Sequence, residues 1–253
     1  MLIPIGDDDQ HLSGPAFVTL ALMLLNLGVF FLVQQAGGRP SFTYGWSVIP
    51  YEIYAGIDLI AQQVASLGST TIAIPQAPGP EPIYLTVVTS LFMHGGYGHL
   101  FGNLLYLWIF GDNVEHRLGA WGFLGFYLLS GAAGVLVQIW LNPTSVVPML
   151  GASGAISGVL GAYLVFFPKN KVHALLLYTV VSIPASLAIG VWVLLQFVNG
   201  IGAVAYTQSV GGVAYGAHIG GFVLGVLLAL GLRALIDAPD PPAQPRTSRP
   251  RSL

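Results

Sequence analysis

Six long runs of apolar, almost uncharged residues dominate this chain of 253 residues. A helix that crosses a bilayer needs roughly 20 mostly apolar residues, because its backbone polar groups find no water in hydrocarbon. The runs approach this length and end at charged residues, proline or glycine. They cover residues 15–35, 98–109, 119–141, 151–167, 172–198 and 211–232, and the second extends upstream through 84–93. The sequence therefore predicts an all-α membrane protein with six transmembrane helices.

The scarcity of charge supports this fold class and excludes others. Charged residues form 7% of the chain, whereas soluble domains carry about 25%. The net charge of −2 and the lack of a basic stretch with stacking aromatic residues exclude nucleic acid as a partner. Because the chain has no cysteine, serine is the expected covalent nucleophile, and cysteine-ligated zinc is excluded. No cofactor or metal is expected.

The basic residues predict the orientation. With the N-terminus in the cytoplasm, seven of the eight lysines and arginines fall on the cytoplasmic side and Arg39 alone lies outside, as the positive-inside rule requires. The expected units are a cytoplasmic N-terminal tail (1–14), a membrane domain (15–236) and a disordered, proline- and arginine-rich cytoplasmic C-terminal tail (237–253). This multi-pass layout, without a recognisable organelle signal, predicts a prokaryotic inner or plasma membrane. It does not indicate an oligomeric state.

A long outer loop, residues 37–82, separates the first two expected spans and exceeds an ordinary connection. Within it Ile57, Ile60, Val64 and Leu67 recur at helical spacing. This spacing fits a short helix in the membrane interface. An apolar loop packed on the bundle explains the same residues equally well.

Five polar residues stand out in or beside the apolar runs: His94, His99, Asn103, Ser153 and His218. Polar groups at membrane depth are costly and usually face a cavity or a partner. His99 and Asn103 are four residues apart, so they share one face of a helix and can both donate hydrogen bonds to one side. These residues are the candidates for chemistry.

Ser153 is expected at the start of a helix, between Gly151 and Gly154. The free N–H groups of a helix N-terminus can stabilise an oxyanion, and the neutral imidazole of His218 is suited to accept the serine proton. Two structural alternatives remain open: the glycines and serines of 151–161 form a packing stripe, and His218 is a hydrogen-bonded structural residue. Since no carboxylate lies in the fourth or sixth run, a serine–histidine dyad is expected rather than a triad.

Together these motifs resemble the rhomboid intramembrane serine proteases. The resemblance extends over residues 84–232. It rests on His-Gly-Gly-Tyr-Gly-His-Leu-Phe-Gly-Asn at 94–103, Glu-His-Arg at 115–117, Gly-Ala-Ser-Gly at 151–154, and Gly-Ala-His at 216–218 followed by Gly221 and Gly225. The family implies a six-helix bundle whose serine opens the fourth span and whose base lies on the sixth.

The resemblance also implies a role for each matching residue. Ser153 resembles the nucleophile and His218 the general base, while His99, Asn103 and the Ser153 backbone N–H resemble the oxyanion hole. The supporting residues would be His94, Gly151 and Gly154.

Three further positions are compared with the family. Glu115 and Arg117 resemble a structural pair after the second span, and the loop 37–82 resembles one embedded beside the bundle. Ser157 departs from some relatives, which have an aromatic residue there that stacks on the catalytic histidine. This departure bears on how His218 is positioned.

The implied reaction is hydrolysis of a peptide bond in or near the transmembrane segment of another membrane protein, within the lipid bilayer. A transporter or channel lined by histidines is a competing function, but the chain has no inverted repeat and no transmembrane carboxylate for ion coupling. An inactive relative that only binds membrane proteins is a third alternative. The intact Ser153 and His218 argue against it.

Overall fold

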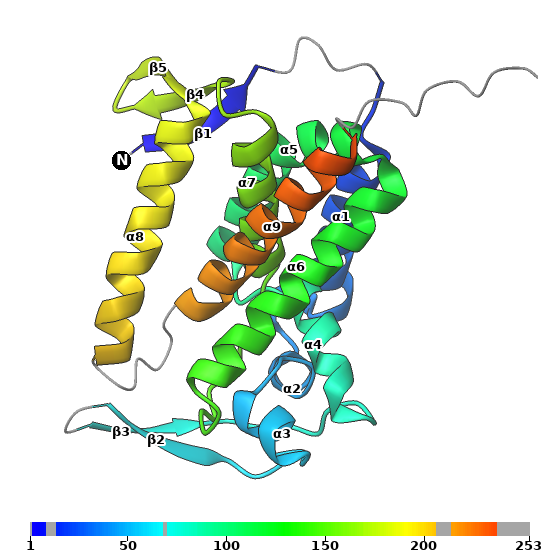
Figure 1. Cartoon of the computed structure of the whole chain (residues 1–253). Coiled ribbons are helices and arrows are strands. Elements are labelled where there is room, and N and C mark those ends of the chain that lie inside the picture. Colours follow the sequence, from blue (N-terminus) through cyan, green and yellow to red (C-terminus); the bar gives the residue numbers. More distant parts are fainter. Residues whose placement is uncertain (1, 9–13, 68–69, 206–213, 237–253) are drawn as a thin grey trace, which may run out of the picture.

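The computed structural model describes residues 2–8, 14–67, 70–205 and 214–236, and it is mostly helical. The helices are α1 (Phe17–Gly28), α2 (Pro40–Gly45), α3 (Pro50–Ala55), α4 (Thr86–Thr89), α5 (Tyr97–Leu118), α6 (Ala120–Leu141), α7 (Ser153–Phe166), α8 (Ala185–Ala205) and α9 (Tyr215–Ile236). The strands are β1 (Leu2–Asp7), β2 (Gln63–Leu67), β3 (Thr70–Ile74), β4 (Lys171–Leu176) and β5 (Thr179–Pro184). Figure 1 shows the sheet of β1, β4 and β5 at one end of the helical bundle and the β2–β3 hairpin at the other.

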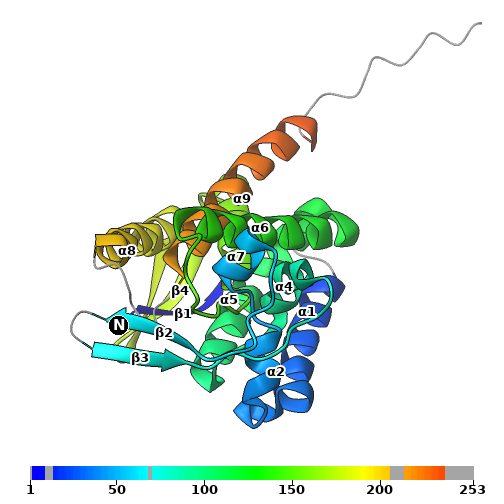
Figure 2. The same cartoon turned by 90° about the horizontal axis from the view of Figure 1, so that it is seen from below.

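Helix α7 is the central element of the bundle. It packs against α5, α6 and α9, and every residue from 154 to 163 is buried. A helix that is apolar on all sides is stable only when it is enclosed by other elements, and Figures 1 and 2 show α7 among these helices. Ser153, the first residue of α7, is thereby placed inside the bundle rather than on its outer surface.

Glycine residues allow α7 and α9 to approach each other closely. A Cβ atom on Gly221 would overlap the carbonyl oxygen of Gly154, and one on Gly225 would overlap that of Gly158. Small residues permit such backbone contact between helices in membrane proteins. The packing stripe that the sequence offered as an alternative to chemistry is therefore present, and the same stripe brings the two helices that carry Ser153 and His218 together.

Two helices in the described part of the chain, α6 and α9, are long and apolar enough to cross a membrane. The other apolar helical stretches are shorter: Phe17–Val33, Ile83–Phe92, Ser153–Phe166 and Ala185–Val198. The prediction of a mostly helical fold is confirmed, but the described part of the chain is not all-α, since it also contains β1 to β5. The count of six spans stays a prediction.

The second expected span is divided into separate elements. Residues 83–92 form three short helical segments, and the backbone becomes extended at Met93. Helix α5 begins only at Tyr97, after Gly95 and Gly96. The paired glycines interrupt the helix because they do not favour helical backbone, so the apolar stretch 84–93 does not extend α5.

The prediction that the fifth span starts near residue 172 is wrong. Residues 171–184 form the antiparallel β4–β5 hairpin, and α8 starts at Ala185. Val172, Val180, Val181 and Ile183 are β-branched, which favours strands over helices. A short apolar run of this kind fits a buried strand as well as a helix.

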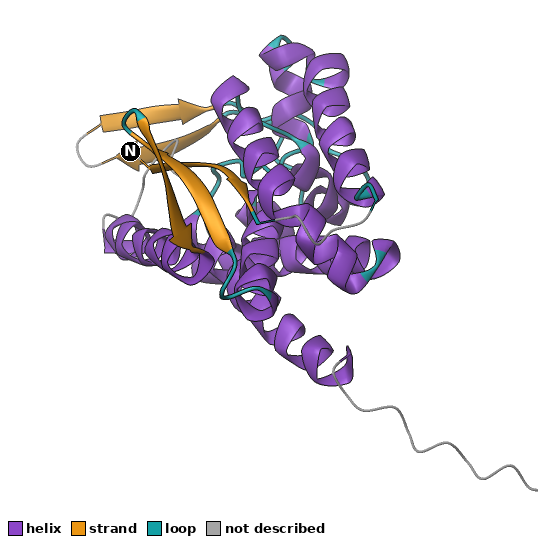
Figure 3. Cartoon of the chain, turned by 90° about the horizontal axis from the view of Figure 1, so that it is seen from above, coloured by secondary structure: helices purple, strands orange, loops and turns teal. Residues whose placement is uncertain are grey.

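The N-terminal segment is not only a polar tail. Leu2–Asp7 forms β1, which pairs antiparallel with β4 from Leu2 opposite Leu176 to Asp7 opposite Val172. Figure 3 shows this strand completing the sheet. The Asp7 carboxylate accepts hydrogen bonds from Asn113 of α5, at 2.9 Å, and from the Tyr163 hydroxyl of α7. The N-terminal strand is therefore tied to the core helix. The expected tail 237–253 lies outside the described residues.

The loop between α1 and α5 carries α2, α3 and the β2–β3 hairpin. Of the two interpretations left open for Ile57 to Leu67, the interfacial helix is not formed, because residues 57–62 are not helical and Gln63–Leu67 form β2, paired with Thr70–Ile74. Threonine and isoleucine in this partner strand favour extended backbone. Local hydrophobic spacing cannot reveal a pairing with a later segment.

Glu52 of α3 is a buried carboxyl in this loop, with 1% of its surface exposed. Burial raises the pKa of Glu52 to about 7; the Leu59 N–H, which donates to Oε1 at 2.8 Å, opposes this shift, and nearby Asp58 adds to it. Between about pH 4.5 and 7 the unfolded chain loses this proton while the folded protein keeps it. The free energy of unfolding therefore falls as pH rises through this range.

We expect Glu52→Gln, which keeps an acceptor for Leu59 but carries no charge, to remove this part of the pH dependence. Thermal unfolding in detergent at about pH 5 and about pH 8 measures the effect. The midpoint of the wild type should fall more between these conditions than that of the variant. Equal falls in both proteins contradict a raised pKa at Glu52.

Candidate active site

The two residues that the sequence pairs are in direct contact. The hydroxyl oxygen of Ser153 lies 2.7 Å from Nε2 of His218, although the residues are 65 positions apart. Ser153 opens α7 and His218 lies in the first turn of α9, so the contact depends on the close approach of these helices. His218 is buried, with 8% of its surface exposed. This distance allows an imidazole to take the hydroxyl proton.

Backbone hydrogen bonds hold the segment that precedes Ser153. Val48 and Met149 exchange two N–H to carbonyl bonds of 3.0 and 2.8 Å, and the Gly151 N–H donates to the Ser90 carbonyl at 2.8 Å. Gly151 has a φ of 124°, which disfavours any residue with a side chain. Helix α7 therefore starts from a turn that is held by backbone hydrogen bonds to Val48 and Ser90.

His99 and Asn103 face this turn. A Cβ atom on Gly151 would overlap the imidazole of His99 and would lie 3.7 Å from Nδ2 of Asn103. Asn103 is also 3.0 Å from Nε2 of His94, and the rings of His94 and His99 are in edge contact with centroids 5.1 Å apart. His94, His99 and Asn103 thus form one cluster beside the turn that leads into Ser153.

The backbone of His94 is fixed by a side chain of the first helical segment. The Gln34 amide accepts a hydrogen bond from the His94 N–H and donates one to the His94 carbonyl, each at 3.0 Å. Both residues are buried. These two hydrogen bonds replace the helical hydrogen bonding that is lost where the backbone is extended before α5.

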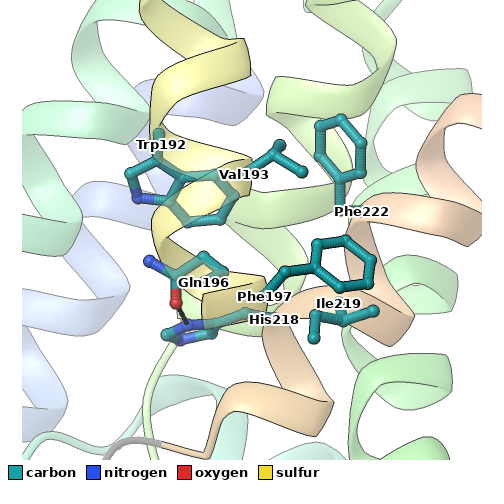
Figure 4. Close-up of a pocket in the computed structure, with 7 residues that line it drawn as sticks. All are labelled: Trp192, Val193, Gln196, Phe197, His218, Ile219 and Phe222. Atoms are coloured by element: carbon teal, nitrogen blue, oxygen red, sulfur yellow. Dashed lines mark hydrogen bonds between the residues drawn. The ribbon is translucent and has the colours of Figure 1, made fainter. Parts of the chain in front are cut away.

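Two residues beside His218 were not predicted from the sequence. Oε1 of Gln196 lies 2.8 Å from Nδ1 of His218, and the ring of Trp192 lies over the imidazole at 6.0 Å between centroids and 37° between planes. Both come from α8, and Figure 4 shows them on the same side of the imidazole. The available signal was a glutamine one turn after a tryptophan, in a helix that is otherwise apolar except for Ser186 and Asn199.

The aromatic contacts of His218 do not come from position 157. Ser157 is buried, and its hydroxyl donates to the Ser153 carbonyl at 2.6 Å. Trp192 and Tyr215, whose ring centroid lies 6.4 Å from that of His218, supply aromatic neighbours instead. The departure at Ser157 therefore leaves the imidazole with aromatic packing from other helices.

Glu115 and Arg117 each join helices. The Glu115 carboxylate accepts hydrogen bonds from the backbone N–H groups of Val18 and Thr19, at 2.9 and 2.7 Å, and from the Thr19 hydroxyl at 2.8 Å. A carboxylate at a helix N-terminus satisfies free N–H groups and complements the helix dipole. The Arg117 guanidinium lies over the Phe166 ring, 5.7 Å from its centroid. Both residues are structural links of the bundle.

The fold and this contact define a class: a helical bundle with two apolar helices long enough to span a bilayer and a serine–histidine pair at the centre. In the described part of the chain, no cluster of three or more histidine, aspartate or glutamate side chains could hold a metal ion. Residues 82–235 match the family model of the Rhomboid domain, which is more than half of the chain. The chain belongs to the rhomboid family.

Several characterised proteins are similar to the chain. Rhomboid protein 1, mitochondrial, of Saccharomyces cerevisiae is 38% identical over 113 residues, 43% of this chain and 30% of that protein. Rhomboid protease GluP of Bacillus subtilis is 31% identical over 141 residues, 53% of this chain and 26% of that protein. RHOMBOID-like protein 6, mitochondrial, of Arabidopsis thaliana is 31% identical over 204 residues, 70% of this chain and 62% of that protein. The matched stretch spans less than a third of the first two relatives.

The comparisons correct the expected location. Two of these relatives are named as mitochondrial, and further matches are named as mitochondrial or chloroplastic. They point to an organellar membrane, so the prediction of a prokaryotic inner or plasma membrane, with both termini in the cytoplasm, is wrong. The prediction rested on the multi-pass layout and on the lack of a recognisable organelle signal, and a multi-pass layout is common to membrane proteins of either origin.

Proposed function

We propose that this protein is an intramembrane serine protease that hydrolyses a peptide bond in or near the transmembrane segment of another membrane protein. The observation that carries the proposal is the 2.7 Å contact between the Ser153 hydroxyl and Nε2 of His218 inside an apolar bundle. Membership of the rhomboid family and similarity to proteins named as rhomboid proteases support it. The proposed membrane domain has six spans, of which α6 and α9 are the longest apolar ones.

In the proposed mechanism the Ser153 oxygen attacks the scissile carbonyl carbon while Nε2 of His218 takes the hydroxyl proton. The carbonyl oxygen becomes an oxyanion, and the donors available to it are His99, Asn103 and the Ser153 N–H. The intermediate collapses to an acyl-enzyme when His218 gives its proton to the leaving amine. Water then attacks the ester, His218 again accepts and returns a proton, and Ser153 is regenerated.

The cluster beside Gly151 supports the proposed oxyanion hole. Asn103 carries two N–H bonds on Nδ2, and one of them is directed to Nε2 of His94 at 3.0 Å. The second remains available for a substrate oxygen. His94 would therefore act by fixing the Asn103 amide, and Gly151 would keep the space in front of His99 and Asn103 free of a side chain.

The proposal is tested by reconstituting the purified protein in vesicles with a panel of tagged single-span proteins. The expected result is a cut within or next to a transmembrane segment, mapped by mass spectrometry. Intact substrates throughout the panel, together with no reaction of the folded protein with a fluorophosphonate, would overturn the proposal.

Asn103→Ala is expected to lower the rate of cleavage by about 10²–10³-fold, the usual cost of one oxyanion donor, and to leave measurable activity. Activity should persist because His99 and the Ser153 N–H remain as donors. Initial rates at saturating substrate measure the effect, and thermal unfolding checks that the loss of the His94 contact leaves the fold intact. An unchanged rate in a folded variant removes Asn103 from the oxyanion hole.

A further inference from the structure

The side of His218 that faces away from Ser153 has a polar partner. Oε1 of Gln196 lies 2.8 Å from Nδ1 (Figure 4). On the other side of the ring, Nε2 lies 2.7 Å from the Ser153 hydroxyl. An amide oxygen can only accept a hydrogen bond, so Nδ1 carries the proton in this contact. In a neutral imidazole the other nitrogen then has a free lone pair. Nε2 is therefore the acceptor that faces Ser153.

The reverse amide orientation would have the opposite consequence. If Nε2 of Gln196 faced Nδ1, the amide would donate, and the imidazole proton would move to the nitrogen beside Ser153. That tautomer cannot accept the serine proton. The contact with Gln196 thus selects between a histidine that can act as a base and one that cannot.

The surroundings of Gln196 give this contact its strength. Gln196 is half-buried in α8, where the flanking residues Leu194 and Leu195 are exposed on the apolar outside. A polar group in such a setting is costly unless it is hydrogen-bonded, so Gln196 is held to His218. Trp192, one turn earlier, packs on the same imidazole at 6.0 Å between centroids. Together they fix both the plane and the rotation of the ring.

We infer that Gln196 is the positioning residue of the proposed dyad: it accepts a hydrogen bond from the Nδ1–H of His218 and so keeps Nε2 unprotonated toward Ser153. This inference rests on the proposed function. Gln196 takes the place that a carboxylate has in a serine–histidine–aspartate triad, where the third residue sets the tautomer and stabilises the imidazolium. An amide does so through its dipole and places no net charge in the apolar bundle.

Two substitutions at position 196 distinguish the hydrogen bond that Gln196 accepts from the packing of its side chain. Gln196→Met keeps the length of the side chain and removes the strong acceptor, whereas Gln196→Glu keeps an acceptor oxygen on a stem of equal length. Leu195→Met is the matched control on the neighbouring, outward-facing residue, which is 52% exposed. The full chain in detergent is treated with a fluorophosphonate probe, which acylates an activated serine without needing a peptide site.

Saturation of labelling with the probe gives a maximal rate and a half-saturating concentration. Gln196→Met should lower the maximal rate by about 10²-fold, within the range of general-base effects, and leave the half-saturating concentration unchanged. Gln196→Glu should restore the rate to within a few-fold of the wild type, and Leu195→Met should label like the wild type. If the folded wild type is not labelled, the proposed function is overturned. If the wild type is labelled and Gln196→Met is labelled at the same rate, only the inference about Gln196 is overturned. Equal losses in Gln196→Met and Gln196→Glu would also overturn only that inference.

A spectroscopic measurement tests the tautomer directly. In protein labelled with ¹⁵N-histidine, the His218 signals should identify Nδ1 as the protonated nitrogen, with assignment from His218→Ala. Gln196→Met should shift these signals toward a mixture of tautomers, which a purely structural role would not do. Protonation at Nε2 in the wild type overturns the inference.

Discussion

Ser153→Ala is expected to abolish both substrate cleavage and fluorophosphonate labelling. The substitution removes the hydroxyl oxygen that forms the acyl-enzyme in the proposed mechanism. In another serine protease, loss of the nucleophilic serine lowers kcat by about 10⁶-fold. His218→Ala should have an effect of similar size, since the hydroxyl then has no acceptor at 2.7 Å. Because the two residues act as one unit in the proposed mechanism, the double variant should be no worse than either single variant.

Ser157→Ala is the matched control for this experiment. Ser157 lies one turn further along α7, is fully buried, and donates its hydroxyl to the Ser153 carbonyl at 2.6 Å. Its loss leaves the Ser153 hydroxyl and the imidazole unchanged, so labelling should persist. Labelling of Ser153→Ala at the level of the wild type would show that another residue is the nucleophile, and the proteolytic mechanism would be lost.

The juxtaposition of Ser153 and His218 could be predicted because its cause, the small residues around each position, can be seen in each segment separately. Both residues lie in runs of small residues, and such runs permit close backbone contact wherever the two helices meet. The same glycines pack the two helices and bring Ser153 close to His218, so the packing interpretation and the catalytic interpretation were not exclusive. His99 and Asn103 could be placed together because their spacing puts them on one face of a helix.

Gln196 and the β4–β5 hairpin could not be predicted in the same way. Whether Gln196 meets His218 depends on the rotation and lateral position of α8, which its almost uniformly apolar sequence does not specify. The pairing of the hairpin with β1 depends on contacts between segments more than 160 residues apart, such as Leu2 with Leu176. Hydropathy reports burial in an apolar setting but does not distinguish a strand from a helix.

Gly221→Ala is expected to destabilise the protein and to remove most of its activity. The added methyl group would overlap the carbonyl oxygen of Gly154, so α7 and α9 must move apart. Overpacking of a close contact costs about 1–3 kcal/mol. The movement also separates Ser153 from His218, and a misplacement of about 1 Å at a reacting pair can cost about 10²-fold in rate. Thermal unfolding and fluorophosphonate labelling measure the two effects.

Gly231→Ala provides the control on the same helix. No atom lies within 4 Å of a Cβ placed on Gly231, and alanine favours a helix over glycine by about 1 kcal/mol. This variant should therefore unfold at the same or a higher temperature and label at the wild-type rate. If Gly221→Ala and Gly231→Ala behave alike, contact between α7 and α9 does not position the dyad. If Gly221→Ala alone loses labelling while it remains folded at the assay temperature, the glycine stripe sets the distance on which the chemistry depends.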